Sequence, residues 1–234
     1  MKHTLLVKDW LSSFLSLLFP RCCVVCGRPL AKGEECICTV CNIKLPRTNY
    51  HLRKDNPVER LFWGQIPLER ATSFFFYEKG SDFRLILHRL KYGGQKEIGA
   101  IMGRYMAAEL LSSNFFQGID VIIPIPLHKK KQQIRGYNQS EWIARGIAAV
   151  TGIPIDTESI LRKKNTETQT RKSVFERRDN VEGIFELQHP ETLAGKHILI
   201  VDDVLTTGST TLACASCLVD VEDIRISILT LATA

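Results

Sequence analysis

Apolar-rich runs alternate with segments of helical spacing through the carboxyl-terminal half of the chain. The runs cover residues 119–124, 198–201 and 224–230. Between them, residues 138–150 and 209–218 repeat small and apolar residues at helical spacing. Apolar strands spaced by helices are typical of parallel sheets that helices cover on both faces. The pattern therefore predicts an α/β fold built on a parallel sheet.

The amino-terminal half has a different pattern. An aromatic-rich run at 71–77 predicts a strand, and helical spacing predicts helices over 83–92 and 98–111. Residues 46–70 carry three prolines in a polar run, which indicates a linker. In residues 1–19, apolar side chains recur at helical spacing, but Asp9 interrupts them and no small-residue cleavage site follows. We expect an amphipathic helix there rather than a secretion signal.

Composition and charge narrow the class of protein. The 234 residues are 44% hydrophobic and 24% charged, which is ordinary for a globular protein and argues against disorder or a coiled coil. No apolar run approaches the ~20 residues of a membrane span. Because the amino terminus does not read as a secretion signal, we expect a cytoplasmic protein. The net charge of +6 suits an anionic partner such as phosphate, a nucleotide or nucleic acid.

Six of the eight cysteines lie between positions 22 and 41. They include two C-x-x-C pairs that eleven residues separate. Each pair can direct two thiolates at one ion, and two pairs complete a tetrahedral sulfur site. The spacing predicts a structural zinc ion bound by Cys23, Cys26, Cys38 and Cys41.

Two other roles for these cysteines compete with zinc binding. A reducing cytoplasm disfavours a disulfide framework, and a redox pair would open a helix after a strand, which neither motif clearly does. Cys22 and Cys36 could each replace a neighbouring ligand, so both alternatives stay open. Cys214 and Cys217 lie in an apolar helical stretch and are interpreted as small buried side chains.

The segment 197–211 carries the most informative chemistry. An apolar strand ends at Asp202 and Asp203, and a loop rich in Thr, Gly and Ser then opens a helix. Ligands of α/β sheets bind beyond the carboxyl ends of strands, and backbone N–H groups at a helix start suit a phosphate. Sugar hydroxyls and a Mg²⁺ ion are both compatible with two adjacent carboxylates. A phosphate, vicinal hydroxyls and a metal-bound pyrophosphate together describe 5-phosphoribosyl-1-pyrophosphate (PRPP).

Residues 201–210 closely resemble the PRPP-binding signature of type I phosphoribosyltransferases. The whole chain resembles the ComF family of competence-related proteins, on this motif, the cysteine pairs and the segments 90–94, 124–128 and 135–140. The resemblance implies a type I phosphoribosyltransferase fold with an amino-terminal zinc ribbon. It divides the chain into the helix at 1–19, a zinc-ribbon module at 20–48, a linker and hood region at 49–118 and the core domain at 119–234.

The resemblance also implies roles for individual residues. Asp202, Asp203 and Arg135 are the expected catalytic residues, and a polar, basic segment at 162–178 is the expected loop over pyrophosphate. Tyr137 either stacks on a base or packs. The expected contacts to PRPP are Asp202, Asp203, Thr206, Thr207, Gly208, Ser209, Thr210, Pro126, Leu127, Lys91, Gln169 and Arg171.

Two functions follow from the resemblance. The first is Mg²⁺-dependent transfer of a phosphoribosyl group to an acceptor. Thr206 stands where hypoxanthine-type relatives carry an Asp general base, which disfavours a nucleobase that must be deprotonated. The second is a protein of DNA uptake that binds single-stranded DNA, with a DNA-uptake helicase as a partner, through the basic segments 129–135 and 162–178.

Overall fold

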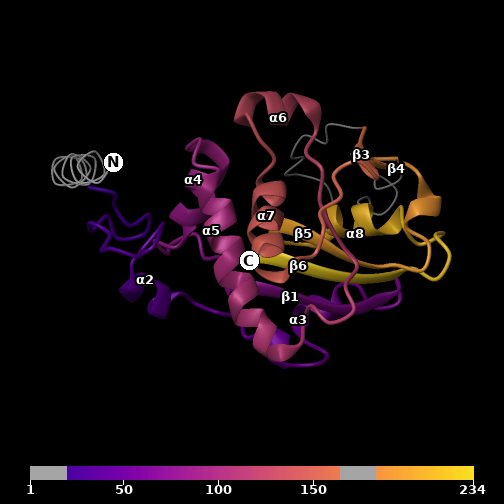
Figure 1. Cartoon of the computed structure of the whole chain (residues 1–234), viewed down its shortest axis with the longest axis horizontal. Coiled ribbons are helices and arrows are strands. Elements are labelled where there is room, and N and C mark those ends of the chain that lie inside the picture. Colours follow the sequence, from indigo (N-terminus) through magenta and orange to yellow (C-terminus); the bar gives the residue numbers. More distant parts are fainter. Residues whose placement is uncertain (1–19, 164–182) are drawn as a thin grey trace, which may run out of the picture.

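The computed structural model describes residues 20–163 and 183–234 (Figure 1). The helix predicted for residues 1–19 lies outside the described residues, as do the predicted ligand contacts Gln169 and Arg171. Within the described part of the chain, no helix combines the length and the apolar character that a membrane crossing requires.

Four parallel strands form the central sheet, in the order β1-β6-β5-β2. Their bounds are Leu68–Phe76 (β1), Val121–Pro124 (β2), His197–Leu205 (β5) and Arg225–Thr233 (β6). The register sets Ile123 beside Ile200 and Val201 beside Leu229, so all four carboxyl ends lie at one edge. A separate antiparallel pair joins Ile160–Arg162 (β3) to Phe185–Leu187 (β4). The parallel α/β class predicted from the apolar runs is confirmed.

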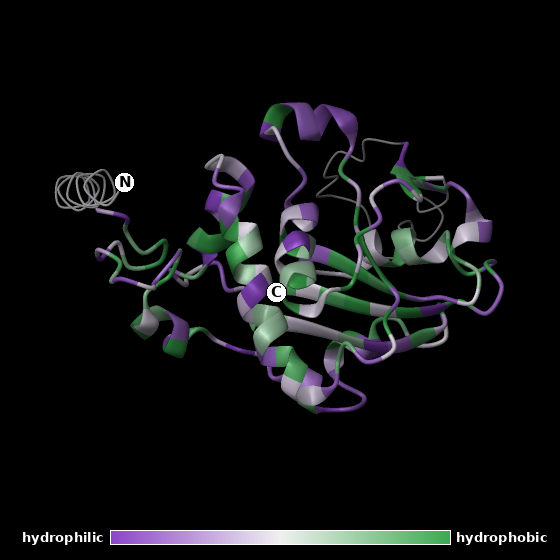
Figure 2. Cartoon of the chain, viewed as in Figure 1, coloured by the Kyte–Doolittle hydropathy of each residue, from purple (hydrophilic) through white to green (hydrophobic). Residues whose placement is uncertain are grey.

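The helices follow the predicted segments closely, with three short additions, α2, α3 and α6. The α-helices are Thr39–Lys44 (α2), Pro57–Arg60 (α3), Arg84–Tyr92 (α4), Glu97–Leu110 (α5), Lys129–Arg135 (α6), Gln139–Thr151 (α7) and Ser209–Ser216 (α8). Short 3₁₀ turns occupy Tyr50–Leu52 (η1), Leu111–Ser113 (η2) and Pro190–Thr192 (η4). Within the predicted linker, α3 begins at Pro57 because the Asn56 side chain accepts hydrogen bonds from the N–H groups of Val58 and Glu59. The lysine run after β2 forms α6, which projects from the body at the top of Figure 1 and is mostly hydrophilic in Figure 2.

Both faces of the sheet are buried. Along β5, Leu199 and Val201 pack in one core cluster with Met102 of α5 and Ile143 of α7. The alternate residues of β5, Ile198 and Ile200, pack in a second cluster with Cys214 of α8. Successive side chains of a strand point to opposite faces, so a strand covered by helices on both sides must be apolar throughout. Cys214 is fully buried and Cys217 partly buried, as expected for packing residues.

Helices α5 and α7 cross almost backbone to backbone. A Cβ atom added at Gly103 would lie 2.2 Å from the carbonyl oxygen of Ile143, and one at Gly146 would lie 2.1 Å from that of Ala100. No side chain fits at either position without moving a helix. Since α5 comes from the predicted hood region and α7 from the predicted core, this crossing joins the two regions firmly.

The sheet extends beyond the core boundary predicted at residue 119, because β1 pairs along its length with β6. The outer edge of β1 is closed by the preceding segment. The N–H of Thr48 donates to Phe74 O at 3.1 Å, and the Asn56 amide donates to Ala71 O at 2.9 Å. Covering an edge strand in this way removes a site of unwanted strand pairing.

The cysteine-rich module docks on α5, to the left in Figure 1. Arg104 of α5 donates to Glu35 at 2.6 Å, and Arg47 donates to Glu109 of the same helix at 2.6 Å. The thiol of Cys36 lies 3.9 Å from the sulfur of Met102 in the core. Two ion pairs and apolar packing therefore hold the module on α5, because Val24, Val25 and Ile37 belong to the same core cluster as Met102.

Candidate functional site

A cavity of about 310 Å³ opens at the carboxyl edge of the sheet. It lies between the loop after β2, the first turns of α7 and α8, and the end of α4. Seven of the predicted site residues line it, namely Lys91, Pro126, Leu127, Arg135, Asp202, Asp203 and Thr210. The structure brings these residues together from four separate segments, and their binding roles stay predictions.

Two adjacent carboxylates at the end of β5 face different partners. Asp203 Oδ1 lies 3.0 Å from Lys91 Nζ. Asp202 Oδ1 accepts hydrogen bonds from the Ser140 hydroxyl at 2.9 Å and from the Asp203 N–H at 2.8 Å. Burial and then the charge of Asp203 raise the pKa of Asp202 to about 7, against those hydrogen bonds and the charge of Lys91.

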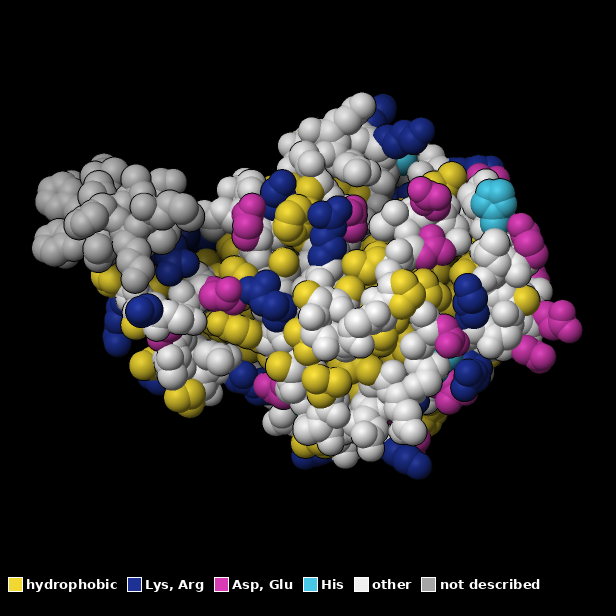
Figure 3. All heavy atoms as spheres, viewed as in Figure 1, with side chains coloured by type: hydrophobic (Ala, Val, Ile, Leu, Met, Phe, Trp, Pro, Cys, Tyr) yellow, Lys and Arg dark blue, Asp and Glu magenta, His cyan; other side chains and the backbone are white. Residues whose placement is uncertain are grey.

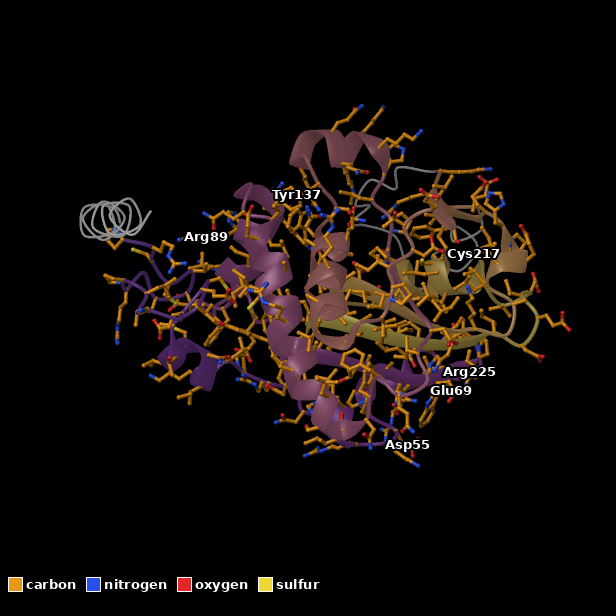
Figure 4. All side chains as sticks on the ribbon, in the orientation of Figure 1. Asp55, Glu69, Arg89, Tyr137, Cys217 and Arg225 are labelled. Carbon is orange, nitrogen blue, oxygen red and sulfur yellow. The ribbon has the colours of Figure 1, made fainter. Side chains whose placement is uncertain are left out.

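The end of α4 is fastened to this site through three successive residues. The Leu90 carbonyl accepts a hydrogen bond from the Tyr137 hydroxyl at 2.5 Å, Lys91 pairs with Asp203, and the Tyr92 ring lies 5.5 Å from the Arg135 guanidinium carbon. Figure 4 shows Tyr137 between α4 and the segment that joins α6 to α7. Tyr137 is buried, so of its two predicted roles the structure has it packing.

The Arg135 side chain is oriented by a buried neighbour. Its guanidinium donates to Gln139 Oε1 at 2.7 Å, across the turn at Gly136 between α6 and α7. Gly136 has a φ of 78°, a conformation that costs least without a side chain. Asn138 then fixes the start of α7, because its amide donates to Ile125 O at 3.0 Å and its oxygen accepts from the Ser140 N–H at 3.1 Å.

The loop from Thr206 to Thr210 forms a small hollow of about 30 Å³ at the start of α8. Gly208 is the residue before the helix and has a φ of 76°. The hydroxyls of Thr207 and Ser209 lie 2.9 Å apart on its rim. Free backbone N–H groups at a helix start, with hydroxyls beside them, can bind one anionic group of phosphate size.

Sequence reasoning missed Arg162 as a separate site residue. It ends β3, lines the cavity, and its guanidinium carbon lies 5.3 Å from the centre of the Phe185 ring. Burial lowers the pKa of Arg162, while the charge of Asp202 opposes that change. The basic segment 162–178 was expected to lie over the ligand, but only the fold places Arg162, one of the described residues of that segment, in the cavity near Asp202. Ser140 and Gln139 were missed in the same way.

The four cysteines of the two C-x-x-C pairs form one cluster, with all sulfur atoms within 4.8 Å of one another. Cys38 Sγ lies 3.7 Å from Cys26 Sγ, and the Cys38 N–H donates to Cys23 Sγ at 3.3 Å. Burial raises the pKa of Cys23, but hydrogen bonds from the backbone of Cys26, Cys38 and Val25 outweigh it and lower that pKa to about 7. Four thiol groups at these separations could hold a zinc ion.

The two alternative ligands, Cys22 and Cys36, both lie outside this cluster. Cys22 is exposed and outside the cluster, and Cys36 is buried against Met102 instead. Gly27 follows the first pair with a φ of 73°, the conformation expected of a tight turn around a metal site. The predicted set of four is therefore the set that the structure brings together.

Comparison with known proteins adds relatives along most of the chain. No protein-family model matches the sequence. The DNA utilization protein YhgH of Escherichia coli O157:H7 is 32% identical over 209 residues, which cover 83% of this chain and 88% of that protein. Competence protein ComFC of Bacillus subtilis is 26% identical over 216 residues, 90% of this chain and 83% of the relative. Competence protein F of Haemophilus influenzae is 31% identical over 130 residues, 54% and 57% of the two chains.

Solved structures similar to this one include phosphoribosyltransferases. Adenine phosphoribosyltransferase from Leishmania tarentolae is 12% identical with a TM-score of 0.38, over 81% of this chain and 94% of that one. Glutamine PRPP amidotransferase from B. subtilis is 20% identical with a TM-score of 0.36, over 58% of this chain and 26% of that one. These likenesses are too distant to assign a function. The sequence relatives are decisive at the level of family, and the chain belongs to the ComF family of competence and DNA-utilization proteins.

Proposed function

We propose that the protein binds PRPP at the carboxyl edge of its sheet and transfers the phosphoribosyl group to an acceptor. The observation that best supports this proposal is the acidic pair of Asp202 and Asp203, which has a phosphate-sized loop on one side and cationic side chains on the other. A molecule with a phosphate, a sugar and a second anionic group would match that order. The loop would take the 5-phosphate, and Asp202 and Asp203 would accept hydrogen bonds from the ribose hydroxyls.

The pyrophosphate end of the ligand would meet the positive side of the cavity. Lys91, Lys131, Arg135 and Arg162 all line it, against two carboxylates. The ion pair between Lys91 and Asp203 already offsets one negative charge, which reduces repulsion of an anionic ligand. Mg²⁺ would arrive bound to the pyrophosphate and would add positive charge at the leaving group.

The chemistry would be a displacement at C1 of the ribose. The bond from C1 to the pyrophosphate oxygen breaks, the bond to the acceptor forms, and positive charge develops on the ring between the two events. Asp202 and Asp203 would stabilise that charge, while Arg135 and its neighbours would stabilise the departing pyrophosphate. Thr206 supplies no general base, so we expect an acceptor that reacts without deprotonation by the loop.

A turnover assay with separate binding measurements tests this function. PRPP with Mg²⁺ is offered together with amines, nucleobases and single-stranded DNA as acceptors, and release of pyrophosphate is followed. Asp202→Asn with Asp203→Asn should lower turnover more than binding, because the developing positive charge loses its counter-charge. If PRPP binds but no acceptor releases pyrophosphate, transfer is refuted for that panel and binding stands.

We further propose that the cysteine cluster holds one structural zinc ion. Four sulfur ligands fill a tetrahedral site and leave no open position for catalysis. The module has little apolar core of its own, so the ion would supply much of its folding free energy. This site lies in the cysteine-rich module and takes no part in the proposed transfer.

A second candidate function is binding of single-stranded DNA, which the names of the relatives and one surface feature favour. Lys129 and Lys130 are exposed on α6, and Figure 3 shows basic side chains over that helix. An adjoining cavity of about 460 Å³ adds His128, Arg162 and Lys163 to the same side. Clustered cations of this kind bind phosphodiester chains without reading sequence.

Salt dependence separates the DNA reading from the small-molecule reading. Affinity for a single strand should fall steeply with added salt, and Lys129→Gln with Lys130→Gln should reduce the slope by about two. Lys32→Gln with Lys44→Gln, two exposed lysines of the cysteine-rich module, is the matched control. Binding that is insensitive to salt, or absent, would refute this candidate.

A further inference from the structure

The motif at 135–140 contains buried polar residues that the proposed function does not use. Gln139 is 1% exposed and Ser140 is 4% exposed, although both side chains are polar and lie at the start of a helix. Burying a polar side chain without a hydrogen-bond partner costs free energy, so each must have one. Their partners are two charged residues of the site, Arg135 and Asp202.

Other contacts hold the first turn of α7 in place, independently of Arg135 and Asp202. Asn138 ties it to the loop after β2 through Ile125 O, and α7 packs against β5 and β2. From this position the Ser140 hydroxyl meets Asp202 Oδ1 at 2.9 Å, across 62 residues of sequence. The distance and the buried setting make this a well-formed hydrogen bond rather than a surface contact.

The hydrogen bond restricts which part of Asp202 is open to a ligand. Oδ1 receives two donors, the Ser140 hydroxyl and the Asp203 N–H. The charged groups near Asp202 are Asp203, Lys91 and Arg162. The Ser140 hydroxyl, carried by a fixed helix, restricts the orientation of the Asp202 carboxylate, because a hydrogen bond has a preferred direction at the acceptor.

We propose that Ser140 is a positioning residue, which holds Asp202 so that its second oxygen faces the sugar hydroxyls of the ligand. This inference rests on the proposed binding of a phosphoribosyl ligand. It assigns a role to a residue that lines the same cavity but that the proposed transfer does not itself use.

If Ser140 positions Asp202, removing its hydroxyl should weaken binding of a sugar phosphate but not binding of phosphate alone. Ser140→Ala should lower the affinity for ribose 5-phosphate by roughly tenfold, the worth of one hydrogen bond to a charged group at its lower limit. Affinity for inorganic phosphate, which needs only the loop from Thr206 to Thr210, should stay unchanged. Both ligands are titrated by calorimetry or by nuclear magnetic resonance, without divalent cations. Alanine favours helices, so α7 itself should not suffer.

Two further variants make the test specific. Ser73→Ala removes another buried hydroxyl hydrogen bond, to Thr230 in the same sheet, and should change neither affinity. In an Asp202→Ala background, Ser140→Ala should have no further effect on ribose 5-phosphate, because the group it positions is gone.

The possible results distinguish the proposed phosphoribosyl binding from the positioning role of Ser140. If the wild type binds neither ligand, the proposed function fails. If the wild type binds both and Ser140→Ala weakens both equally, or weakens neither, the positioning role is overturned while phosphoribosyl binding stands. An additive effect in the Asp202→Ala background would also overturn the positioning role.

Discussion

Lys91 Nζ lies 3.0 Å from Asp203 Oδ1, so the last turn of α4 reaches across the site to the end of β5. The two residues are 112 positions apart in sequence, and both side chains are largely shielded from solvent. A cation from one region thus neutralises an acid of the other. The pair couples the amino-terminal part of the protein to the site at the sheet edge.

Replacing Lys91 tests that coupling. Lys91→Met keeps the length of the side chain but leaves the negative charge of Asp203 unopposed. We expect affinity for PRPP to fall about tenfold at low salt, because a charged hydrogen-bond partner is lost and repulsion of the ligand grows. Lys96→Met, which removes a cation that lies over the Trp142 ring instead, is the control in the same calorimetric titration. Equal affinities for the Lys91 variant and the wild type would refute the role.

Ionisation of the buried Asp202 carboxyl beside Asp203 should lower the stability of the folded protein at high pH. The folded pKa of Asp202 is about 7 against an ordinary value of 3.8, so the native state keeps a proton that the unfolded chain has lost. Stability should therefore decline as pH rises between these two values, and the full cost should be present above the folded pKa. Asp202→Asn should raise the melting temperature at pH 8, with a difference that shrinks toward pH 4.

Melting curves across pH check this, with Asp220→Asn at an exposed position as the control for loss of one negative charge. The account is contradicted if Asp202→Asn and Asp220→Asn change the melting temperature alike at every pH. A lower melting temperature for Asp202→Asn at pH 8 would contradict it as well.

The crossing of α5 and α7 should tolerate no side chain. In Gly146→Ala the new Cβ would lie 2.1 Å from Ala100 O and 2.9 Å from Arg104 N, both backbone atoms that cannot rotate away. We expect a loss of about 3 kcal/mol or more in the free energy of unfolding, at the upper end for overpacked sites. Gly80→Ala, in open space, should be nearly neutral. Urea unfolding measures both, and a change under 0.5 kcal/mol for Gly146→Ala, roughly the surface level, would count against the packing.

The cysteine cluster should hold about one zinc ion per chain. Cys41→Ser should lose the ion and expose residues 20–45 to protease, while the sheet stays folded. Cys22→Ser is the control, since that exposed cysteine lies outside the cluster. Elemental analysis and limited proteolysis give the answer, and full zinc content in a double variant of Cys23 and Cys38 would exclude this ligand set.

Local pattern predicted most of the elements but not their neighbours. Ile198 to Val201 had to be a strand covered on both faces, because no polar alternation interrupts it. The run at 71–77 was correctly predicted as a strand, yet its partner β6 lies about 150 residues further on, and only the folded chain reveals it. The lysines at 129–131 carry no apolar period, so α6 could not be predicted from spacing.

The candidate site also contains some residues that the sequence predicts and others that only the fold brings in. Asp202, Asp203 and the following loop form one contiguous segment, and the four cysteines form two short ones, so both were visible in the sequence. Ser140 of α7 and Arg162 of the short strand β3 come near Asp202 only through the tertiary fold. The segments 135–140 and 162–178 stood out in the sequence, but a serine and an arginine are common residues, and nothing in the sequence marks these two as neighbours of Asp202.

The central claim is that a phosphate binds in the loop around Gly208, and calorimetric titration of Gly208→Val tests it most directly. A β-branched residue is strained at a φ of 76°, so Gly208→Val should change the shape of the loop, although its Cβ would be in ordinary contact with the Phe62 ring at 3.5 Å. Gly152→Val introduces similar backbone strain at the end of α7, away from the site, and is the control. We predict that the wild type and Gly152→Val bind both ribose 5-phosphate and PRPP, and that Gly208→Val loses affinity for both. If Gly208→Val binds both ligands as tightly as the wild type, the phosphate does not lie in this loop and the account is wrong.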